Sequence, residues 1–139
     1  MKQNMNDENI RDLAMRNKFF KRVLRTGKYA QIVAMNIPSN ESVEEIHADC
    51  DEVVHVINGV GICLLNNLVV PINSQDIVFI QAGTRYAIKN TNTKRLHLVI
   101  IYSPSIYNDK IVYDLEQSKN YNIQTFPTRL ESSIDYDEP

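Results

Sequence analysis

Short β-type runs separated by turn residues limit the folds open to this chain more than any other feature. Between residues 19 and 104, apolar runs alternate with Gly, Asn, Asp or Pro at intervals of about ten residues, and no helical period interrupts them. Asn66-Asn67 is a two-residue hairpin signal, because Asn tolerates the left-handed backbone region. The pattern predicts an all-β sandwich or barrel. The predicted strands are 19–25, 29–37, 43–47, 52–57, 62–65, 68–72, 77–80, 85–89, 96–102 and 111–115.

The segment before these runs has a helical pattern. Apolar residues recur at i, i+3 and i+4 from Ile10, and Asn6 or Asp7 can cap the helix. We therefore expect a short N-terminal helix ahead of the β domain, and a polar tail with an acidic end after it. The expected divisions are 1–18 for the helical arm, 19–118 for the β domain and 119–139 for the tail.

Composition excludes several classes of function. The formal net charge is −2 and the basic residues are dispersed, which argues against nucleic-acid binding. No apolar run approaches the roughly 20 residues that span a bilayer, and the first residues lack a signal-peptide core. The expected location is cytoplasmic, with no membrane partner. Cys50 and Cys63 suit that location as reduced thiols, one exposed in a loop and the other buried in a strand.

Metal-ligand chemistry is concentrated in residues 44–61, E-E-I-H-A-D-C-D-E-V-V-H-V-I-N-G-V-G. On an extended strand Glu45 and His47 point to the same side, because the side-chain period is two. Glu52 follows a polar bend of four residues, and a hairpin-like reversal there would return its carboxylate to the same pocket. One imidazole and two carboxylates around an open position suit Zn²⁺, Fe²⁺ or Mn²⁺.

This stretch resembles the first sequence motif of the cupin superfamily, G-x5-H-x-H-x3–4-E-x6-G. The interval from Glu52 to Gly59 matches the E-x6-G part of the motif. His47 takes the second histidine position, and Glu45 stands at the first. The resemblance implies that these side chains are the metal ligands of a cupin.

The second cupin motif, G-x5-P-x-G-x2-H-x3-N, is visible as Q-D-I-V-F-I-Q-A-G-T-R-Y-A-I-K-N. Gly83 and Asn90 are in place, whereas Gln75 replaces the leading glycine and Gln81 the proline. Tyr86 stands at the position of the histidine that supplies the fourth ligand. A neutral phenol with a pKa near 10 is a poorer ligand than imidazole, so three ligand candidates of four remain.

The resemblance covers roughly residues 19–118 and extends to a group of small bacterial cupins labelled mannose-6-phosphate-isomerase-like. It implies an all-β fold, the cupin double-stranded β-helix (a jelly-roll barrel), here with a short N-terminal helix. It also implies one divalent metal ion, Zn, Fe, Mn or Ni. The alternative is a barrel that binds no metal, because the fourth ligand is replaced by Tyr86.

Each candidate at this site has a structural alternative. His47 is either a metal ligand or a polar pocket residue, and Glu44 competes with Glu45 for its role. Alternation places Glu52 on the inward face, where a carboxylate without metal needs a hydrogen-bond or basic partner. Tyr86 is either a pocket wall or a phenolate ligand.

The remaining histidines and one arginine have other assignments. His55 alternates away from Glu52, which predicts a surface or subunit-interface residue. His97 is either a core histidine or a replacement for the missing ligand. Arg85 is expected to be solvated.

Three functions fit these patterns. The leading hypothesis is a single-domain cupin that binds a small polar ligand, sugar-like or carboxylate-bearing, through Glu45, His47, Glu52 and Tyr86, with a partly degraded metal site. The alternatives are a metal-dependent sugar isomerase or epimerase, and a non-catalytic structural homodimer. A homodimer is expected in each case, through the apolar run Phe19, Phe20, Val23 and Leu24.

Overall fold

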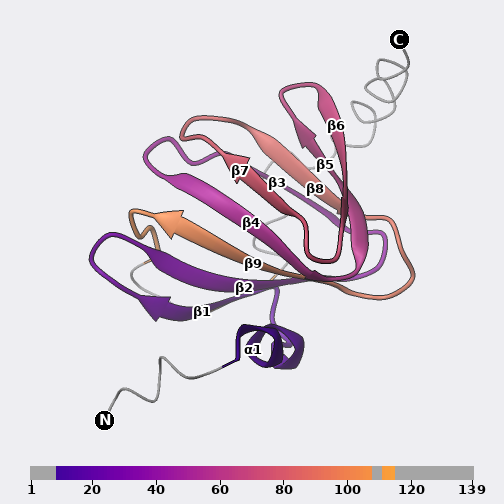
Figure 1. The fold of residues 1–139 in the computed structure, drawn as a ribbon, viewed down its shortest axis with the longest axis horizontal. Coiled ribbons are helices and arrows are strands. Elements are labelled where there is room, and N and C mark those ends of the chain that lie inside the picture. The colour runs from indigo at the N-terminus through magenta and orange to yellow at the C-terminus, as the bar shows by residue number, and fades with distance from the viewer. Residues whose placement is uncertain (1–8, 108–110, 115–139) are drawn as a thin grey trace.

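Two antiparallel sheets that face each other form the body of the protein (Figure 1). The computed structural model describes residues 9–107 and 111–114. One sheet has six strands in the order β10-β1-β2-β9-β4-β7, and the other has four in the order β3-β8-β5-β6. The strands are β1 (Lys21–Thr26), β2 (Gln31–Ile37), β3 (Ser42–Glu45), β4 (Asp51–Asn58), β5 (Val60–Leu65), β6 (Leu68–Asn73), β7 (Ile77–Ile80), β8 (Tyr86–Asn90), β9 (Leu96–Ser103) and β10 (Val112–Tyr113).

The hydrophobic core fills the space between the sheets. On β4 the burial alternates, so that Glu52, Val54 and Val56 face inward, as strand periodicity predicts. The central strand β9 pairs with both β2 and β4 and is buried along most of its length. The largest fully buried apolar side chains come from both sheets: Met35, Ile37, Ile72, Ile80, Tyr86, Ile88, Leu96, Leu98, Ile100 and Tyr102.

Turn chemistry sets the strand ends as the sequence predicts. Asn66 and Asn67 have φ values of 51° and 71° and join β5 to β6 in register, with Leu65 opposite Leu68. Gly59 has a φ of 118°, which favours glycine, at the turn between β4 and β5. These turns fix which side chains of the neighbouring strands point inward.

The short helix α1 (Ile10–Arg16) lies on the outer side of the six-stranded sheet, where Ala14 packs against Ile57 and Val99. Its N-cap is Asn9, whose side-chain oxygen accepts hydrogen bonds from the first turn of the helix. The expected caps, Asn6 and Asp7, lie outside the described residues.

Two further details differ from the expectations. The strand expected over 43–47 ends at Glu45, so His47 lies in the connection to β4. Cys50, expected to be exposed in a loop, is buried and packs with the core side chains between the sheets. Cys63 is buried as expected, and both thiols are free.

The last described strand is shorter than predicted. The strand expected over 111–115 is the two-residue β10, which pairs with β1 at the sheet edge. The expected tail, 119–139, lies outside the described residues, and the division of the chain into three segments stays a prediction. Within the described residues, no helix has the length and apolar content to cross a bilayer.

Gly61 allows β5 and β8 to approach closely, and its replacement by alanine tests this packing. A Cβ atom at position 61 would lie 2.4 Å from the Lys89 carbonyl oxygen, which belongs to the paired strand. We expect Gly61→Ala to lower the free energy of unfolding by about 1–3 kcal/mol in urea denaturation, because the strands must move apart.

Gly27→Ala is the matched control. A Cβ atom there meets only the Ala30 carbonyl oxygen at 3.4 Å, an ordinary contact. The control is expected to leave stability within about 0.5 kcal/mol. Equal losses for the two variants would contradict this account of Gly61.

Candidate functional site

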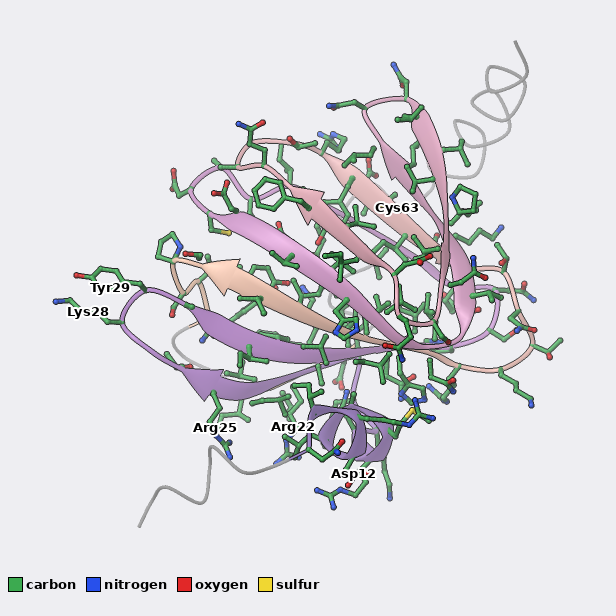
Figure 2. All side chains as sticks on the ribbon, in the orientation of Figure 1. Asp12, Arg22, Arg25, Lys28, Tyr29 and Cys63 are labelled. Carbon is green, nitrogen blue, oxygen red and sulfur yellow. The ribbon has the colours of Figure 1, made fainter. Side chains whose placement is uncertain are left out.

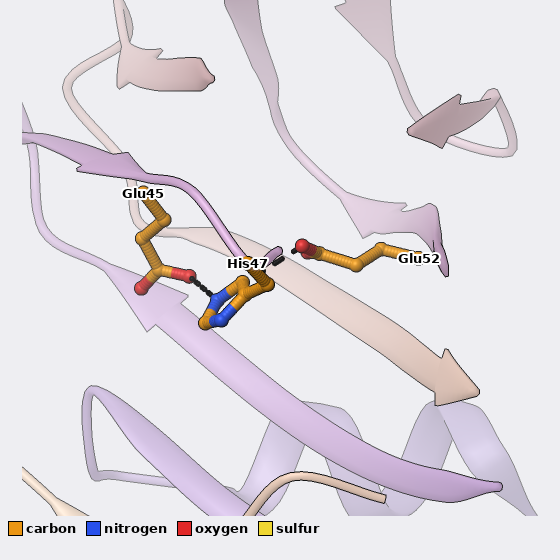
Figure 3. A group of neighbouring side chains, drawn as sticks. All are labelled: Glu45, His47 and Glu52. Atoms are coloured by element: carbon orange, nitrogen blue, oxygen red, sulfur yellow. Dashed lines mark hydrogen bonds and ion pairs between the residues drawn. The ribbon is translucent and has the colours of Figure 1, made fainter. Parts of the chain in front are cut away.

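Three side chains from one stretch of chain meet at one end of the barrel (Figure 3). Glu45 ends β3, Glu52 lies near the start of β4, and His47 lies in the connection between these strands. Strand pairing adds a fourth residue to this group, because Tyr86 at the start of β8 is directly opposite Glu45. The structure therefore brings together all four candidates from the sequence.

Hydrogen bonds connect these four side chains. His47 Nε2 lies 3.0 Å from Glu45 Oε1 and 3.9 Å from Glu52 Oε2. The Tyr86 hydroxyl donates to Glu52 Oε1 at 2.6 Å and to Glu45 Oε1 at 3.3 Å. Tyr86 is thus a hydrogen-bond donor between two carboxylates.

Lys21 is a fifth member of the site that the sequence analysis missed. Its ammonium group forms a buried ion pair with Glu45 Oε2 and also donates to the Tyr107 hydroxyl. The signal was present in strand periodicity, since Lys21 is opposite the core residue Met35 and on the same face of β1 as Val23. A lysine at the end of a strand is nevertheless predicted to be exposed to solvent when no buried partner is known.

Glu45 and Glu52 have pKa values shifted in opposite directions. Burial, the largest influence on Glu45, favours its neutral form, but the charge of Lys21 and the contacts with His47 outweigh burial and lower the pKa to about 2. Burial raises the pKa of Glu52, and the Tyr86 hydrogen bond and His47 offset this only in part.

Tyr86 remains a neutral phenol. Burial first, and then the charges of Glu45 and Glu52, raise its pKa well above the usual value. A phenol that keeps its proton donates hydrogen bonds and does not act as an anionic metal ligand. This favours the pocket-wall interpretation of Tyr86 over the phenolate-ligand one.

The donor set fits a divalent metal ion. One potential ligand atom from each of Glu45, His47 and Glu52 lies within 4.8 Å of the others. Lys21 holds Oε2 of Glu45 and Tyr86 holds Oε1 of Glu52, which leaves the other oxygen of each carboxylate near His47 Nε2. Such fixed orientation of ligands by neighbouring donors is common around protein metal sites.

Access to the site is uneven. The His47 side chain is 21% exposed, whereas those of Glu45 and Glu52 are 4% and 1% exposed. The His47 ring packs edge-to-face on buried Tyr102, with the ring centroids 5.5 Å apart. A small molecule from solvent would therefore meet His47 before it reaches the carboxylates.

The other candidates lie away from this site. His55 is partly exposed on the alternate face of β4, as predicted. His97 is on the outer face of β9 beneath α1, beside Ala14, so it does not replace the missing ligand. Glu44 forms an ion pair with the mostly exposed Arg85 at 3.0 Å. Glu45, and not Glu44, is therefore the glutamate of β3 that contacts His47.

Comparisons with known proteins agree with this architecture. The chain matches no protein-family model. Protein L612 of Acanthamoeba polyphaga mimivirus is 32% identical over 102 residues, which are 70% of this chain and 64% of that protein. Protein YrkC of Bacillus subtilis is 30% identical over 103 residues, 69% of this chain and 55% of that protein. Both bear the name "uncharacterized protein", and the match spans less than two thirds of either.

Solved structures define the fold. BH2720 from Bacillus halodurans superposes with a TM-score of 0.74 at 29% identity, covering 77% of this chain and 86% of that one. A protein with a double-stranded β-helix domain from Klebsiella pneumoniae has a TM-score of 0.63 at 16% identity, covering 78% and 98%. A cupin-2 domain protein from Shewanella frigidimarina has a TM-score of 0.59 at 20% identity, covering 71% and 95%.

The fold is therefore the all-β cupin double-stranded β-helix with a short N-terminal helix, as the sequence predicted. These neighbours show the fold alone, and membership of the cupin superfamily stays a prediction. The narrower mannose-6-phosphate-isomerase-like group stays a prediction.

The opposite pKa shifts predict opposite pH dependence for two variants in chelator. A depressed pKa at Glu45 stabilises the fold above about pH 4.5, and this contribution is lost as pH falls towards 2. Glu45→Gln should thus cost about 3 kcal/mol at pH 7, and less as pH falls. The raised pKa of Glu52 means that its neutral form stabilises the fold at low pH, and this contribution is lost as pH rises. Glu52→Gln, which stays neutral, should therefore become more stable relative to wild type as pH rises.

Urea denaturation between about pH 3 and pH 7.5 measures both trends. Each variant serves as the control for the other, because both lose one carboxylate from the same cluster. Stability differences that change with pH in the same direction for both variants would contradict the assigned shifts.

Proposed function

We propose that this protein binds a small polar molecule, sugar-like or carboxylate-bearing, at the end of its barrel, in a centre that can hold one divalent metal ion. The observation that carries the proposal is the convergence of one oxygen from each buried carboxylate on the partly exposed ring of His47. Buried polar groups gathered at an accessible end of a β-barrel are typical of a small-molecule site.

The metal ion would be held by Glu45, His47 and Glu52. When bound, such an ion acts as a Lewis acid that polarises a ligand oxygen. Tyr86 and Lys21 hold the carboxylates in orientation, and the ring of Tyr102 supports His47. A ligand with hydroxyl groups suits the carboxylate oxygens as acceptors, which is why we favour sugar-like or related polar compounds.

A metal-dependent sugar isomerase or epimerase is the second candidate. One observation favours it: the pKa of Glu52 is raised while that of Glu45 is lowered. Two carboxylates whose environments separate their pKa values are a common arrangement for acid and base roles. In this candidate the ion would polarise a carbonyl group of the substrate, and a carboxylate would exchange the proton.

Metal binding is tested by titrating chelator-stripped protein with Zn²⁺, Mn²⁺, Fe²⁺ and Ni²⁺ and measuring heat and melting temperature. We expect binding near one ion per chain, and we expect His47→Ala to abolish it, because the variant keeps only two of three ligands. His55→Ala is the matched control, since His55 lies on the opposite face of β4 from Glu52. Equal loss in both variants, or unchanged binding in His47→Ala, would refute this centre.

Ligand binding is tested with hexoses, uronic acids and short dicarboxylates, by ligand-observed NMR with and without metal. We expect at least one class to bind wild type and to bind Glu52→Gln at least about tenfold more weakly, since the carboxylate acceptor is lost. Binding that is equal in wild type and in both the Glu52→Gln and His47→Ala variants would place the ligand elsewhere.

The homodimer also remains a proposal. Phe20 of the expected interface run is buried in the core of its own subunit, whereas Phe19 is 38% exposed, and Val23 and Leu24 are partly buried. Phe19 is therefore the member of the run most available to a second copy. Light scattering of the wild type and of Phe19→Ser would show whether a dimer forms and depends on this residue.

A further inference from the structure

The Glu45 carboxylate has a different positive or polar partner on each oxygen. Lys21 binds Oε2, while Oε1 lies 3.0 Å from His47 Nε2 and 3.3 Å from the Tyr86 hydroxyl. We propose that Lys21 supplies the counter-charge that a divalent metal ion would otherwise give Glu45, and thereby sets how tightly the centre holds metal. The proposal rests on the metal centre of the proposed function.

Lys21 is fixed at the site from several sides. It is 4% exposed, and its ammonium group contacts the Tyr107 hydroxyl as well as Glu45. The ammonium nitrogen also lies 5.4 Å from the centre of the Phe20 ring and 4.9 Å from that of Tyr107. A charge enclosed in this way stays beside Glu45 and does not turn out into solvent.

The charge of Lys21 acts on the centre in two ways. It neutralises Glu45, so the barrel folds without an ion, whereas an unpaired buried carboxylate would be costly. It also repels a second cation at Oε1, and this repulsion is strong because the surroundings exclude water. Both effects weaken metal binding while leaving the three ligand atoms in place.

Removing the charge of Lys21 should reverse both effects. In chelator, we expect Lys21→Met to melt roughly 10 °C below wild type, because the buried carboxylate of Glu45 loses its ammonium partner. On addition of Zn²⁺ or Ni²⁺, the variant should recover most of this loss. Its metal dissociation constant should be at least about tenfold lower than that of wild type.

Three further variants isolate the charge. Lys21→Met combined with Glu45→Gln removes both charges, and it should fold without metal and show no tight binding. Tyr107→Phe removes a contact of Lys21 but keeps its charge, so metal binding should stay as weak as in wild type. Lys28→Met is the surface control, because Lys28 projects from the turn between β1 and β2 away from the core (Figure 2).

The outcomes separate this proposal from the metal centre itself. If wild type binds metal through His47 and Lys21→Met binds it no more tightly, Lys21 is only a structural partner of Glu45 and the proposal is overturned. If folded wild type and folded Lys21→Met both fail to bind any of the ions, the centre and the proposal fall together. If Lys21→Met is unfolded in chelator, folding upon addition of metal supports the proposal, and failure to fold with metal contradicts it.

Discussion

Buried polar contacts that cross between the two sheets hold the site together. Lys21, on the six-stranded sheet, pairs with Glu45 on the four-stranded sheet, and Tyr86 on the four-stranded sheet donates to Glu52 on the six-stranded one. Each contact satisfies a carboxylate that burial alone would penalise. Because both contacts span the interior, the geometry of the site depends on how the sheets face each other, and His47 closes the group from the connecting segment.

The series of strands could be predicted because its signals are local. The burial alternation along β4 depends only on neighbouring residues, and so does the turn at Asn66-Asn67. The motif around Glu52 then indicated which all-β fold these strands form. The same locality explains the errors. Asn9, rather than Asn6 or Asp7, caps α1, and nothing in the immediate sequence distinguishes these caps. Cys50 lies among acidic residues and was expected to be exposed, although the bend buries it.

The site was predicted only in part for a similar reason. The short reversal between β3 and β4 brings Glu45, His47 and Glu52 together, as their spacing predicted, although His47 lies in the connection and not on the strand. Lys21 lies 24 residues before Glu45 on the other sheet, and a single lysine gives no local sign of burial. A buried carboxylate needs a basic or hydrogen-bonding partner, and this need can be predicted from sequence. The identity of the partner depends on how the two sheets pack, which brings Lys21 to Glu45.

Tyr86 and Lys21 are best understood together. At the position where a cupin usually supplies its fourth ligand, an imidazole, this chain has a phenol whose hydroxyl contacts both carboxylates. Lys21 adds a positive charge beside one of them. Tyr86 supplies the carboxylates with a hydrogen-bond donor, and Lys21 supplies Glu45 with the positive charge that a metal ion would otherwise provide. The retained ligand geometry and the internal counter-charge are compatible, because Lys21 and His47 use different oxygens of Glu45. If Lys21 sets the metal affinity as we propose, the polar cluster is present with or without an ion, and the charge at position 21 determines how much of the protein holds one.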